Sequence, residues 1–545
     1  MRKRWGMVWT LVVVAALAVA PVATQVAVQA QSTEPVDYDA IHKIKDEGLS
    51  RSQVMDIMSW LTDVHGPRLT GSPTYKKAAD WSMEKMKSWG LTNVRTEPWK
   101  VTPRGGAQQQ GPQPTEFGRG WSNEKFYMQV TAPVPFPVIG FPKAWTASTN
   151  GLVSGDAVLA VMTTEADFGK FKGTLKGKFV LTTAMRAVPE STKALSIRHD
   201  EKTLAELAME EIPTGRAGGG RGGFAGQQRF RDALQRFLAE EGVAVWVDTS
   251  SIADGGTIFA SGGGGRGASA DEPPNVPRVA IAIEHYGRIV RLIEKKVPVK
   301  IEADIRNTFY DNPELTNIFG EIAGTDKADE VVMLGAHFDS WHGGTGATDN
   351  AAGSAVMMEA MRILKASGLK MRRTVRIGLW GGEEQGLIGS RYYARQTFAD
   401  PASGTWSMKP AHGKFSAYYN VDNGTGKIRG VYLQGNEAVA PIFRAWMEPF
   451  HNMGMTTLTP RDTGGTDHLS FDAVGLPGFQ FIQDDVEYDT RTHHSNMDTY
   501  ERIQEADMKQ MAVIVASFVY HTANRAQLLP RKPMPAATTG GRGGN

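Results

Sequence analysis

The histidines and carboxylates able to do chemistry gather just after short apolar runs. These runs, residues 330–335, 374–380 and 415–421, are typical of buried strands. Open α/β sheets place their ligand sites beyond the carboxyl ends of such strands. The candidate residues, in chain order, are His337, Asp339, Asp349, Glu383, Glu384, Asp422, His493 and His494.

Each of these residues has an ordinary structural interpretation when it is taken alone. A His-x-Asp pair at a strand end is often a structural hydrogen bond, and Asp349 can be a helix N-cap. The adjacent glutamates can complement a helix dipole, and Asp422 can lie in an Asx turn. Their convergence on the strand ends of one domain favours a shared site.

The candidate set matches what two metal ions need when they are held side by side. The chain has no cysteine, so its metal ligands must be histidines and carboxylates. Asp349 can bridge two ions. His337 and Asp422 can complete the coordination of one ion. Glu384 and a histidine of the 493–494 pair can complete the other, which makes two zinc ions per chain the expected cofactor.

Two carboxylates remain outside this ligand set. Asp339 lies two residues from His337 and can orient its imidazole. Glu383 can take a proton from the attacking water and return it to a leaving amine. Spacing alone does not say which of the adjacent glutamates is ligand and which is base. The inventory predicts a hydrolase in which Glu383 and Asp339 assist the metals.

Strands and helices alternate in the part of the chain that carries these residues. From Lys300 onward, apolar strand patterns are separated by helical runs such as 351–366 and 438–450. This alternation predicts an α/β fold with a mostly parallel sheet covered by helices on both faces. We expect the catalytic domain to comprise residues 31–125 and 296–525.

The intervening residues, 126–295, have a different texture. Short β-rich runs are separated by turns and glycine tracts, and one amphipathic helix places Phe230, Leu234 and Phe237 on one face. This pattern predicts a small inserted β-rich domain. The glycine-rich tracts within it are expected to be mobile loops, and residues 526–545 a disordered tail.

Composition and the amino-terminal residues indicate the compartment. Lys plus Arg number 60 and Asp plus Glu 58, so no global charge recruits nucleic acid. Basic residues 2–4, the apolar run Met7–Ala20 and small residues at 28 and 30 predict a signal peptide over residues 1–30. An uncleaved anchor is the alternative. We expect an exported protein, periplasmic or secreted, with no stable membrane insertion after cleavage.

Taken together, the motifs resemble those of the zinc-dependent aminopeptidases with two co-catalytic metals, and among them the carboxypeptidase Q branch. The resemblance covers residues 49–523, and its specificity comes from the order and spacing of the motifs. They are GPRLTGSP (66–73), GAHFDSW (335–341), GATDNAAG (346–353), WGGEEQG (380–386), NVDNGTG (420–426), GGTDHLSF (464–471), GLPGFQF (475–481) and HHSNMDTY (493–500).

The resemblance implies a role for each candidate. It implies that Glu383 is the general base and that the insert is a protease-associated domain. It also implies that His494, four residues before Asp498, is the ligand and His493 a neighbour. The implied metal ligands are His337, Asp349, Glu384, Asp422 and His494.

Two further sites stay open at this stage. Asp467 and His468 lie in the family's substrate-pocket loop, and either direct contact with substrate or a structural role fits them. Tyr488 can donate a hydrogen bond to the oxyanion of the reaction or can simply pack.

The expected function is an exported dizinc exopeptidase acting on peptides or dipeptides, as an aminopeptidase or a dipeptidase. One alternative is an enzyme like glutaminyl cyclase with a single zinc. Another is an inactive binding protein on the same scaffold, like the transferrin-receptor ectodomain. The presence of all five ligands and the base argues against both. Side-chain preference and oligomeric state are left open.

Overall fold

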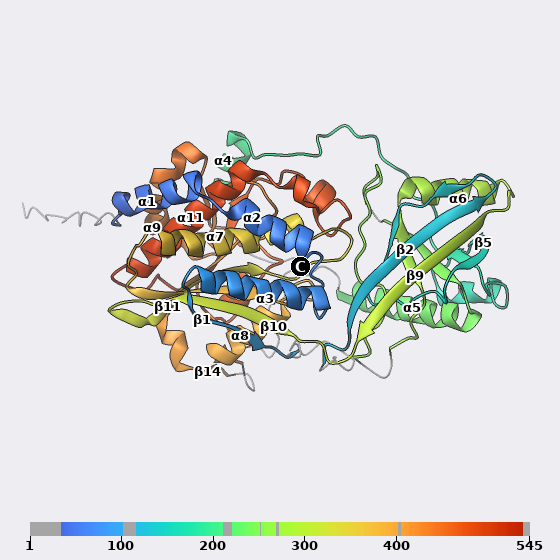
Figure 1. Ribbon diagram of the computed structural model, residues 1–545, viewed down its shortest axis with the longest axis horizontal. Coiled ribbons are helices and arrows are strands. Elements are labelled where there is room, and N and C mark those ends of the chain that lie inside the picture. Colours follow the sequence, from blue (N-terminus) through green and yellow to red (C-terminus); the bar gives the residue numbers. More distant parts are fainter. Residues whose placement is uncertain are drawn as a thin grey trace, which may run out of the picture.

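The described part of the chain forms two lobes. The computed structural model describes residues 34–101, 116–210, 221–250, 252–268, 272–401 and 405–537. The expected signal peptide, residues 1–30, lies outside them. Within them are two eight-stranded sheets and a small two-stranded one, formed by β13 (Ala399–Asp400) and β14 (Ser407–Met408). Figure 1 shows the larger lobe on the left. No helix among the described residues is long and apolar enough to cross a membrane.

The sheet of the larger lobe is mixed, with parallel strands at its centre and a further parallel pair, β16 (Ile428–Tyr432) and β17 (Thr457–Thr459), at one edge. Its order is β1 (Thr92–Pro98), β10 (Thr316–Ile322), β12 (Arg373–Trp380), β11 (Lys327–His337), β15 (Phe415–Asn420), β18 (Gly478–Gln483), β16 (Ile428–Tyr432) and β17 (Thr457–Thr459). β11 pairs in parallel with β12 and β15, and β15 with β18. β10 and β16 run antiparallel to their central neighbours.

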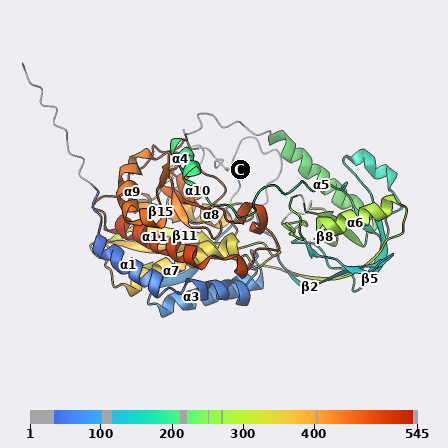
Figure 2. The same ribbon diagram turned by 90° about the horizontal axis from the view of Figure 1, so that it is seen from above.

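Helices cover both faces of this sheet (Figures 1 and 2), which confirms the predicted α/β fold. Two helices, α7 (Ala352–Ala366) and α11 (Glu505–Asn524), are buried between the sheet and outer helices. They are therefore apolar along most of their length. The second face packs through an aromatic cluster on α8 (Ile388–Thr397) and α10 (His468–Asp472). The helices of the first face are α1 (Tyr38–Ser50), α2 (Val54–Ser59), α3 (Pro73–Ser88), α7 (Ala352–Ala366), α9 (Ala440–Met447) and α11 (Glu505–Asn524).

The parallel strands end together at one edge of the sheet. His337 is the last residue of β11 and is paired with Trp380, the last residue of β12. Gly335 is paired with Asn420, where β15 ends. Residues that follow these strands in the sequence therefore lie side by side at this edge, where α/β sheets carry their ligand sites.

The smaller lobe is built on the second sheet. Two cores lie on its two faces, one against α6 (Ile283–Glu294) and one against α5 (Arg221–Glu241). The strand order is β3 (Phe136–Pro137), β2 (Gly120–Ala132), β9 (Lys300–Tyr310), β5 (Val153–Leu159), β6 (Phe179–Leu181), β7 (Val245–Thr249), β8 (Arg278–Ile281) and β4 (Gly140–Pro142).

The limits of this lobe differ from the predicted limits of the insert. β2 begins at Gly120 and β9 ends at Tyr310, and the two strands pair along nearly their whole length. Position 126 lies inside β2, and position 295 lies just before β9. The sequence pattern revealed the short strands between these positions but not the pair of long strands, β2 and β9, that encloses them. We propose residues 120–310 as the inserted unit, called the insert below.

One glycine tract of the insert is packed. A Cβ at Gly264 would lie 1.8 Å from the carbonyl oxygen of Trp145, and one at Gly263 would lie 2.5 Å from the Cβ of Lys143. These glycines permit close backbone approach, whereas the mobility expected for the loop at 261–267 stays a prediction. The tract at 214–226 lies largely outside the described residues.

Part of the carboxyl-terminal segment packs against the larger lobe. Leu529 is buried, and the Arg531 guanidinium donates to the carbonyl oxygens of His412 at 2.9 Å and Phe415 at 2.6 Å. The disordered tail predicted for residues 526–545 stays a prediction, although its first residues make these contacts. A polar, proline-containing segment can be held by its guanidinium–carbonyl bonds without forming a helix or strand.

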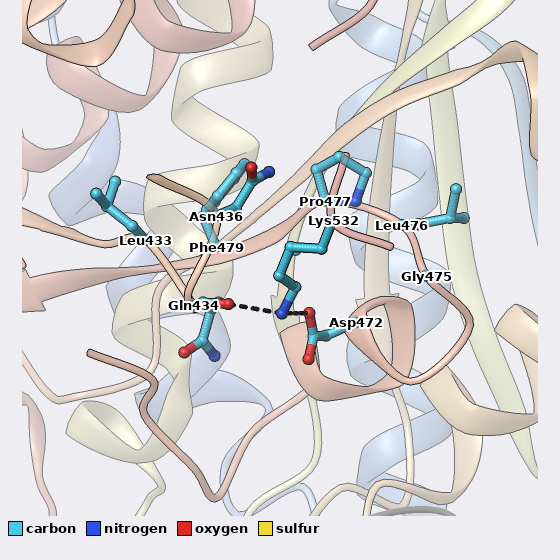
Figure 3. Close-up of a pocket in the computed structure, with 10 residues that line it drawn as sticks. Leu433, Gln434, Asn436, Asp472, Gly475, Leu476, Pro477, Phe479 and Lys532 are labelled. Carbon is cyan, nitrogen blue, oxygen red and sulfur yellow. Dashed lines mark hydrogen bonds and ion pairs between the residues drawn. The ribbon is translucent and has the colours of Figure 1, made fainter. Parts of the chain in front are cut away.

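Lys532 of this segment closes a small pocket, shown in Figure 3. Its ammonium donates to the carbonyl oxygen of Gln434 at 2.6 Å and pairs with Asp472. Gly478, at the start of β18, also lines the pocket. The pocket is therefore near the amino end of β18, opposite the edge where β11 ends at His337.

One segment of the insert, the strap (residues 183–210), reaches across to the larger lobe. Its α4 (Glu201–Met209) lies against that lobe near β17, although the strands before it belong to the smaller lobe (Figures 1 and 2). Ile197 forms an antiparallel bridge with Val486, with two N–H···O bonds of 2.7 Å. The strap therefore docks on the chain shortly before His493.

Arg198 anchors the strap electrostatically. Its guanidinium lies 3.0 Å from the carboxylate of Asp484 and 2.7 Å from that of Asp507. Asp484 is fully buried and also pairs with Arg429 at 2.9 Å. A buried carboxylate requires such partners, because an unpaired buried charge is strongly destabilising.

Replacing Arg198 by alanine is expected to loosen the strap without unfolding either lobe. The variant leaves Asp507 without its cation, whereas Asp484 keeps Arg429. Hydrogen exchange should become faster at the amides of Ile197 and Val486 and stay unchanged in β9. Lys202→Ala, at an 82% exposed side chain on the strap, is the control. Equal protection in both variants would contradict the anchoring role.

Candidate functional site

The five candidate ligands meet at the edge where the parallel strands end. Nε2 of His337 lies 3.1 Å from Oδ1 of Asp349 and 3.1 Å from Oδ1 of Asp422. Nε2 of His494 lies 3.2 Å from Oδ2 of Asp349 and 2.9 Å from Oε2 of Glu384. Asp349 therefore directs one carboxylate oxygen to each of two groups of donors.

The spacing of these atoms fits metal coordination. His337, Asp349 and Asp422 each offer an atom within 4.8 Å of the others, and Asp349, His493 and His494 form a second such group. Two ligands bound at about 2.0–2.1 Å to a tetrahedral ion lie roughly 3.3 Å apart. The observed separations are close to that value, and the donors are the nitrogens and oxygens that zinc accepts.

Two unpartnered oxygens also fit a cation. Oδ2 of Asp349 and Oε1 of Glu384 are buried and accept no hydrogen bond from any described residue. Buried polar atoms are normally satisfied, so atoms left without a donor point to a missing partner. A divalent ion between the carboxylates supplies that partner.

The pKa values of the clustered carboxylates also indicate that a cation is needed between them. Burial raises the pKa of Glu384 well above its usual range, and the charge of Asp349 adds to the rise. Burial also opposes ionisation of Asp349, but the hydrogen bond from His337 and the charge of His494 hold the pKa of Asp349 below its usual range. These carboxylates can be ionised together only when positive charge is placed among them.

Asp339 contributes differently from the role predicted for it. Nδ1 of His337 lies 2.9 Å from the main-chain oxygen of Asp339, whereas the nearer carboxylate oxygen is 3.9 Å away. The carboxylate instead accepts hydrogen bonds from Thr70 Oγ1 at 2.7 Å and from the amides of Glu383 and Glu384 at 3.2 and 3.3 Å. The main chain orients the imidazole, and the side chain holds the turn that carries both glutamates.

Glu383 lies within the cluster but belongs to neither group of donors. Its side chain is buried, and burial raises its pKa well above the usual range. His337 opposes this rise electrostatically, whereas the charges of Asp422 and Asp467 add to it. A carboxylate with a raised pKa beside a metal cluster is suited to accept and return a proton.

Asp498, which sequence reasoning did not select, holds the loop that presents Asp349. Its carboxylate accepts bonds from the amide and hydroxyl of Thr348, at 2.5 and 2.8 Å, and from the amide of Asp349 at 3.3 Å. The backbone of Asp349 is non-helical, so the loop relies on these bonds for its shape. Asp498 lies in the motif 493–500, but sequence reasoning used it only to choose His494 over His493 as the ligand.

Arg68 is the second residue that sequence reasoning missed. Its fully buried guanidinium donates to the carbonyl oxygens of Phe338 and Gly346 at 2.8 Å, and also to those of Leu61 and Thr345. Burial lowers the pKa of Arg68 to about 10, so the group stays charged at neutral pH. It ties together the two loops that carry Asp339 and Asp349. The sequence indicated a role for Arg68 only through its place in the motif GPRLTGSP.

Asp467, His468 and Tyr488, whose roles the sequence left open, lie around the candidate ligands. Asp467 is fully buried, and burial raises its pKa to about 7; neither of its carboxylate oxygens has a hydrogen-bond partner in the described structure. Nε2 of His468 instead faces the carbonyl oxygen of Thr463 at 3.2 Å. Tyr488 is stacked on His493, with ring centroids 4.7 Å apart.

Comparison with known families identifies this arrangement. Residues 317–519 match the model of peptidase family M28. This part of the chain is similar to that family. The M28 segment contains all five candidate ligands and Glu383, whereas Arg68 and the insert lie outside it.

Individual relatives extend the match beyond the M28 segment. Carboxypeptidase Q of Rattus norvegicus is 29% identical over 262 residues, which are 48% of this chain and 52% of that protein, about half its length. Carboxypeptidase Q of Homo sapiens is 28% identical over 493 residues, 90% of each chain. These matches confirm the resemblance to the carboxypeptidase Q branch of the zinc aminopeptidases.

Solved structures share the M28 fold. A peptidase M28 precursor from Shewanella amazonensis superposes with a TM-score of 0.61 at 24% identity, covering 91% of this chain and 98% of that one. A zinc aminopeptidase from Bacillus subtilis gives 0.53 at 18% identity, covering 87% and 95%. Both extend well beyond residues 317–519, so the likeness of fold includes more than the M28 segment.

Replacing Asp498 by alanine is expected to weaken metal binding by about 10- to 100-fold, because hydrogen-bonded supports of metal ligands contribute affinity of that order. The variant releases the loop of Asp349 but removes no ligand. Zinc affinity measured by competition with a chromogenic chelator tests this expectation. Asp489→Ala, at an exposed aspartate nearby, is the matched control. Equal affinity in the two variants would contradict the supporting role.

Proposed function

We propose that the protein is an exported dizinc metallo-exopeptidase that hydrolyses peptide bonds, as an aminopeptidase or a dipeptidase. The observation that carries the proposal is the position of Asp349, with one oxygen at 3.1 Å from His337 and the other at 3.2 Å from His494. A carboxylate shared in this way is the bridging ligand that a pair of metals needs. The match of residues 317–519 to peptidase family M28 and the likeness to a zinc aminopeptidase of Bacillus subtilis support zinc.

Each side chain has a role in this proposal. His337 and Asp422 would hold one ion, Glu384 and His494 would hold the other, and Asp349 would be shared by both. When bound, the two ions polarise the scissile carbonyl and make water easier to deprotonate. Asp339 and Asp498 keep the ligand loops in place by the hydrogen bonds described above.

Glu383 moves the proton. Its carboxylate accepts a proton from water as the water oxygen attacks the carbonyl carbon. It then donates that proton to the amine nitrogen as the C–N bond breaks, so it ends in its starting state. The raised pKa of Glu383 favours this exchange, since a carboxyl with a pKa nearer neutrality holds and returns a proton readily.

The surroundings of the cluster support a restricted substrate. The strap docks immediately before His493, and the insert contacts the residues that follow His494. We propose that the insert is a protease-associated-like module that borders the entrance. Export rests on the amino-terminal pattern and suits a chain without cysteine, whose folding needs no disulfides.

Hydrolysis of a peptide panel, read by mass spectrometry, tests the activity directly. Free and amino-terminally acetylated peptides are compared, together with dipeptides, with and without a chelator. An exopeptidase releases single residues from a terminus. Cyclisation of amino-terminal glutamine without hydrolysis would indicate a glutaminyl cyclase, and no reaction by the zinc-loaded protein would indicate a binding protein.

Metal removal has a defined expected outcome. The purified protein should contain about two zinc ions per chain and lose its activity to 1,10-phenanthroline, because the two donor groups share Asp349. Elemental analysis by mass spectrometry and an activity assay on the same sample measure both quantities. Full activity in a metal-free sample would refute the proposal.

The adjacent glutamates should respond differently to the same substitution. Glu383→Gln keeps shape but cannot accept a proton, so kcat should fall by about 10²- to 10⁴-fold with zinc content unchanged. Glu384→Gln should lower zinc occupancy, with activity partly restored by excess zinc. Glu437→Gln, at an exposed glutamate, is the control. Rescue of Glu383→Gln by zinc would reverse the two assignments.

A further inference from the structure

Side chains from the strand ends of the larger lobe form a row of hydrogen bonds. Nε1 of Trp380 donates to the hydroxyl of Tyr418 at 2.7 Å, and that hydroxyl donates to Oδ1 of Asn420 at 2.6 Å. Nδ2 of Asn420 donates to Oγ1 of Thr466 at 2.9 Å and lies 2.8 Å from the amide group of Gln480 on β18. We call Trp380, Tyr418, Asn420 and Thr466 the buried network.

A glycine of the central strand lets the network cross the sheet. Trp380 belongs to β12 and Tyr418 to β15, and β11 lies between these two strands. A Cβ at Gly335 of β11 would lie 3.0 Å from the hydroxyl oxygen of Tyr418 and 2.2 Å from the carbonyl oxygen of Gly378. A larger residue would therefore crowd the hydroxyl that joins the outer two strands. Gly335 permits a link between β12 and β15 that backbone pairing does not provide.

The members of the network are shielded from water. Trp380, Tyr418 and Asn420 are fully buried, and Thr466 is 3% exposed. The ring of Tyr418 stacks on Phe471 with centroids 4.2 Å apart, so the network lies within the aromatic cluster on this face of the sheet. A buried polar network whose members have partners makes its surroundings rigid, and removal of one partner leaves the others unsatisfied. A change at one member is therefore felt by its neighbours.

The network is joined to three buried carboxylates of the candidate site. Each carboxylate follows a member of the network by three residues or fewer. They are Glu383, Asp422 and Asp467. Burial raises the pKa of Tyr418 well above its usual range, and the charges of these three carboxylates add to the rise. The Tyr418 hydroxyl therefore keeps its proton and remains a donor to Asn420.

Tyr419 offers a comparison on the opposite face of β15. Successive residues of a strand point to opposite faces, and Tyr419 packs in the core that includes α11. Its hydroxyl lies 2.6 Å from Oγ1 of Thr522 on α11, and both residues are fully buried. Two buried tyrosine hydroxyls of one strand therefore make different connections. Tyr418 connects strand ends that carry the candidate site, whereas Tyr419 connects β15 to a helix that carries none of the candidate ligands.

We propose that Tyr418 and Asn420 are positioning residues of the reaction, which hold Glu383 and Asp467 in place relative to the candidate metal ligand Asp422. The inference rests on the proposed peptidase function. In that proposal Glu383 moves the proton but holds no metal. Loosening the network should therefore slow the chemical step and leave zinc content and substrate binding largely unchanged.

Tyr418→Phe tests the proposal in the zinc-loaded, full-length protein, because it removes one hydroxyl and keeps the ring. The substrate is the peptide of the panel that the wild type hydrolyses fastest. The kcat of Tyr418→Phe should fall by about 10- to 100-fold, the range that hydrogen-bonded supports of site residues contribute, with KM and zinc content unchanged. Tyr419→Phe removes an equally buried hydroxyl and is the matched control. Both variants should lose thermal stability, but Tyr419→Phe should keep the kcat of the wild type.

A second pair of variants decides the question if Tyr418→Phe does not fold. Thr466→Val removes the acceptor of Asn420 and should lower kcat, whereas Thr522→Val removes the partner of Tyr419 and should not. Equal kcat within either pair, or full recovery of kcat in excess zinc, would overturn the positioning role alone. Failure of the zinc-loaded wild type to hydrolyse any peptide of the panel would overturn the peptidase proposal, and the positioning role with it.

Discussion

Asp349 presents one carboxylate oxygen to each of two donor groups, and the surrounding structure is arranged to keep it there. Its loop has no regular hydrogen bonding of its own at this point, so the shape comes from Asp498 below it and from the Arg68 guanidinium beside it. This arrangement is costly without a cation, because several buried carboxylates face one another. Arg68 offsets part of that repulsion but makes its hydrogen bonds to carbonyl oxygens, which leaves the carboxylates free to bind metal.

The parallel sheet supplies the rest of the geometry. Pairing of β11 with β12 and β15 brings His337, the glutamate turn and Asp422 to one edge, although long helices separate them in the sequence. The carboxylate of Asp339 then links two of these strand ends, since it accepts hydrogen bonds from the amides of Glu383 and Glu384. Ligands placed by strand ends and fixed by backbone amides have little freedom to move. The half-exposed His494 lies on an irregular segment, and that segment is where the strap and the insert attach.

The ligand types and their positions after strands could be predicted from the sequence, because apolar runs mark buried strands and the chemistry of zinc limits the donors. Other features left no pattern to read. The role of Asp339 depends on whether a main-chain or a side-chain oxygen reaches His337, a difference of about one ångström that spacing does not encode. Arg68 acts on carbonyl oxygens, which every residue has, so nothing in the sequence identifies its partners. Composition suggested mobility at 261–267 and at 526–537, where glycine permits close packing and Arg531 fastens an extended chain.

Neighbouring glycines of one tract differ in what they allow. Gly263 and Gly264 are needed where backbone meets Lys143 and Trp145, whereas a Cβ at Gly262 would meet Trp145 and Trp341 at an ordinary contact distance of 3.6 Å. The candidate metal ligands lie within 317–519, whereas Trp145 and Gly262 lie in the insert, outside that segment. The insert and the larger lobe meet beside His494, and again where the strap docks on Val486 and pairs with Asp484 and Asp507.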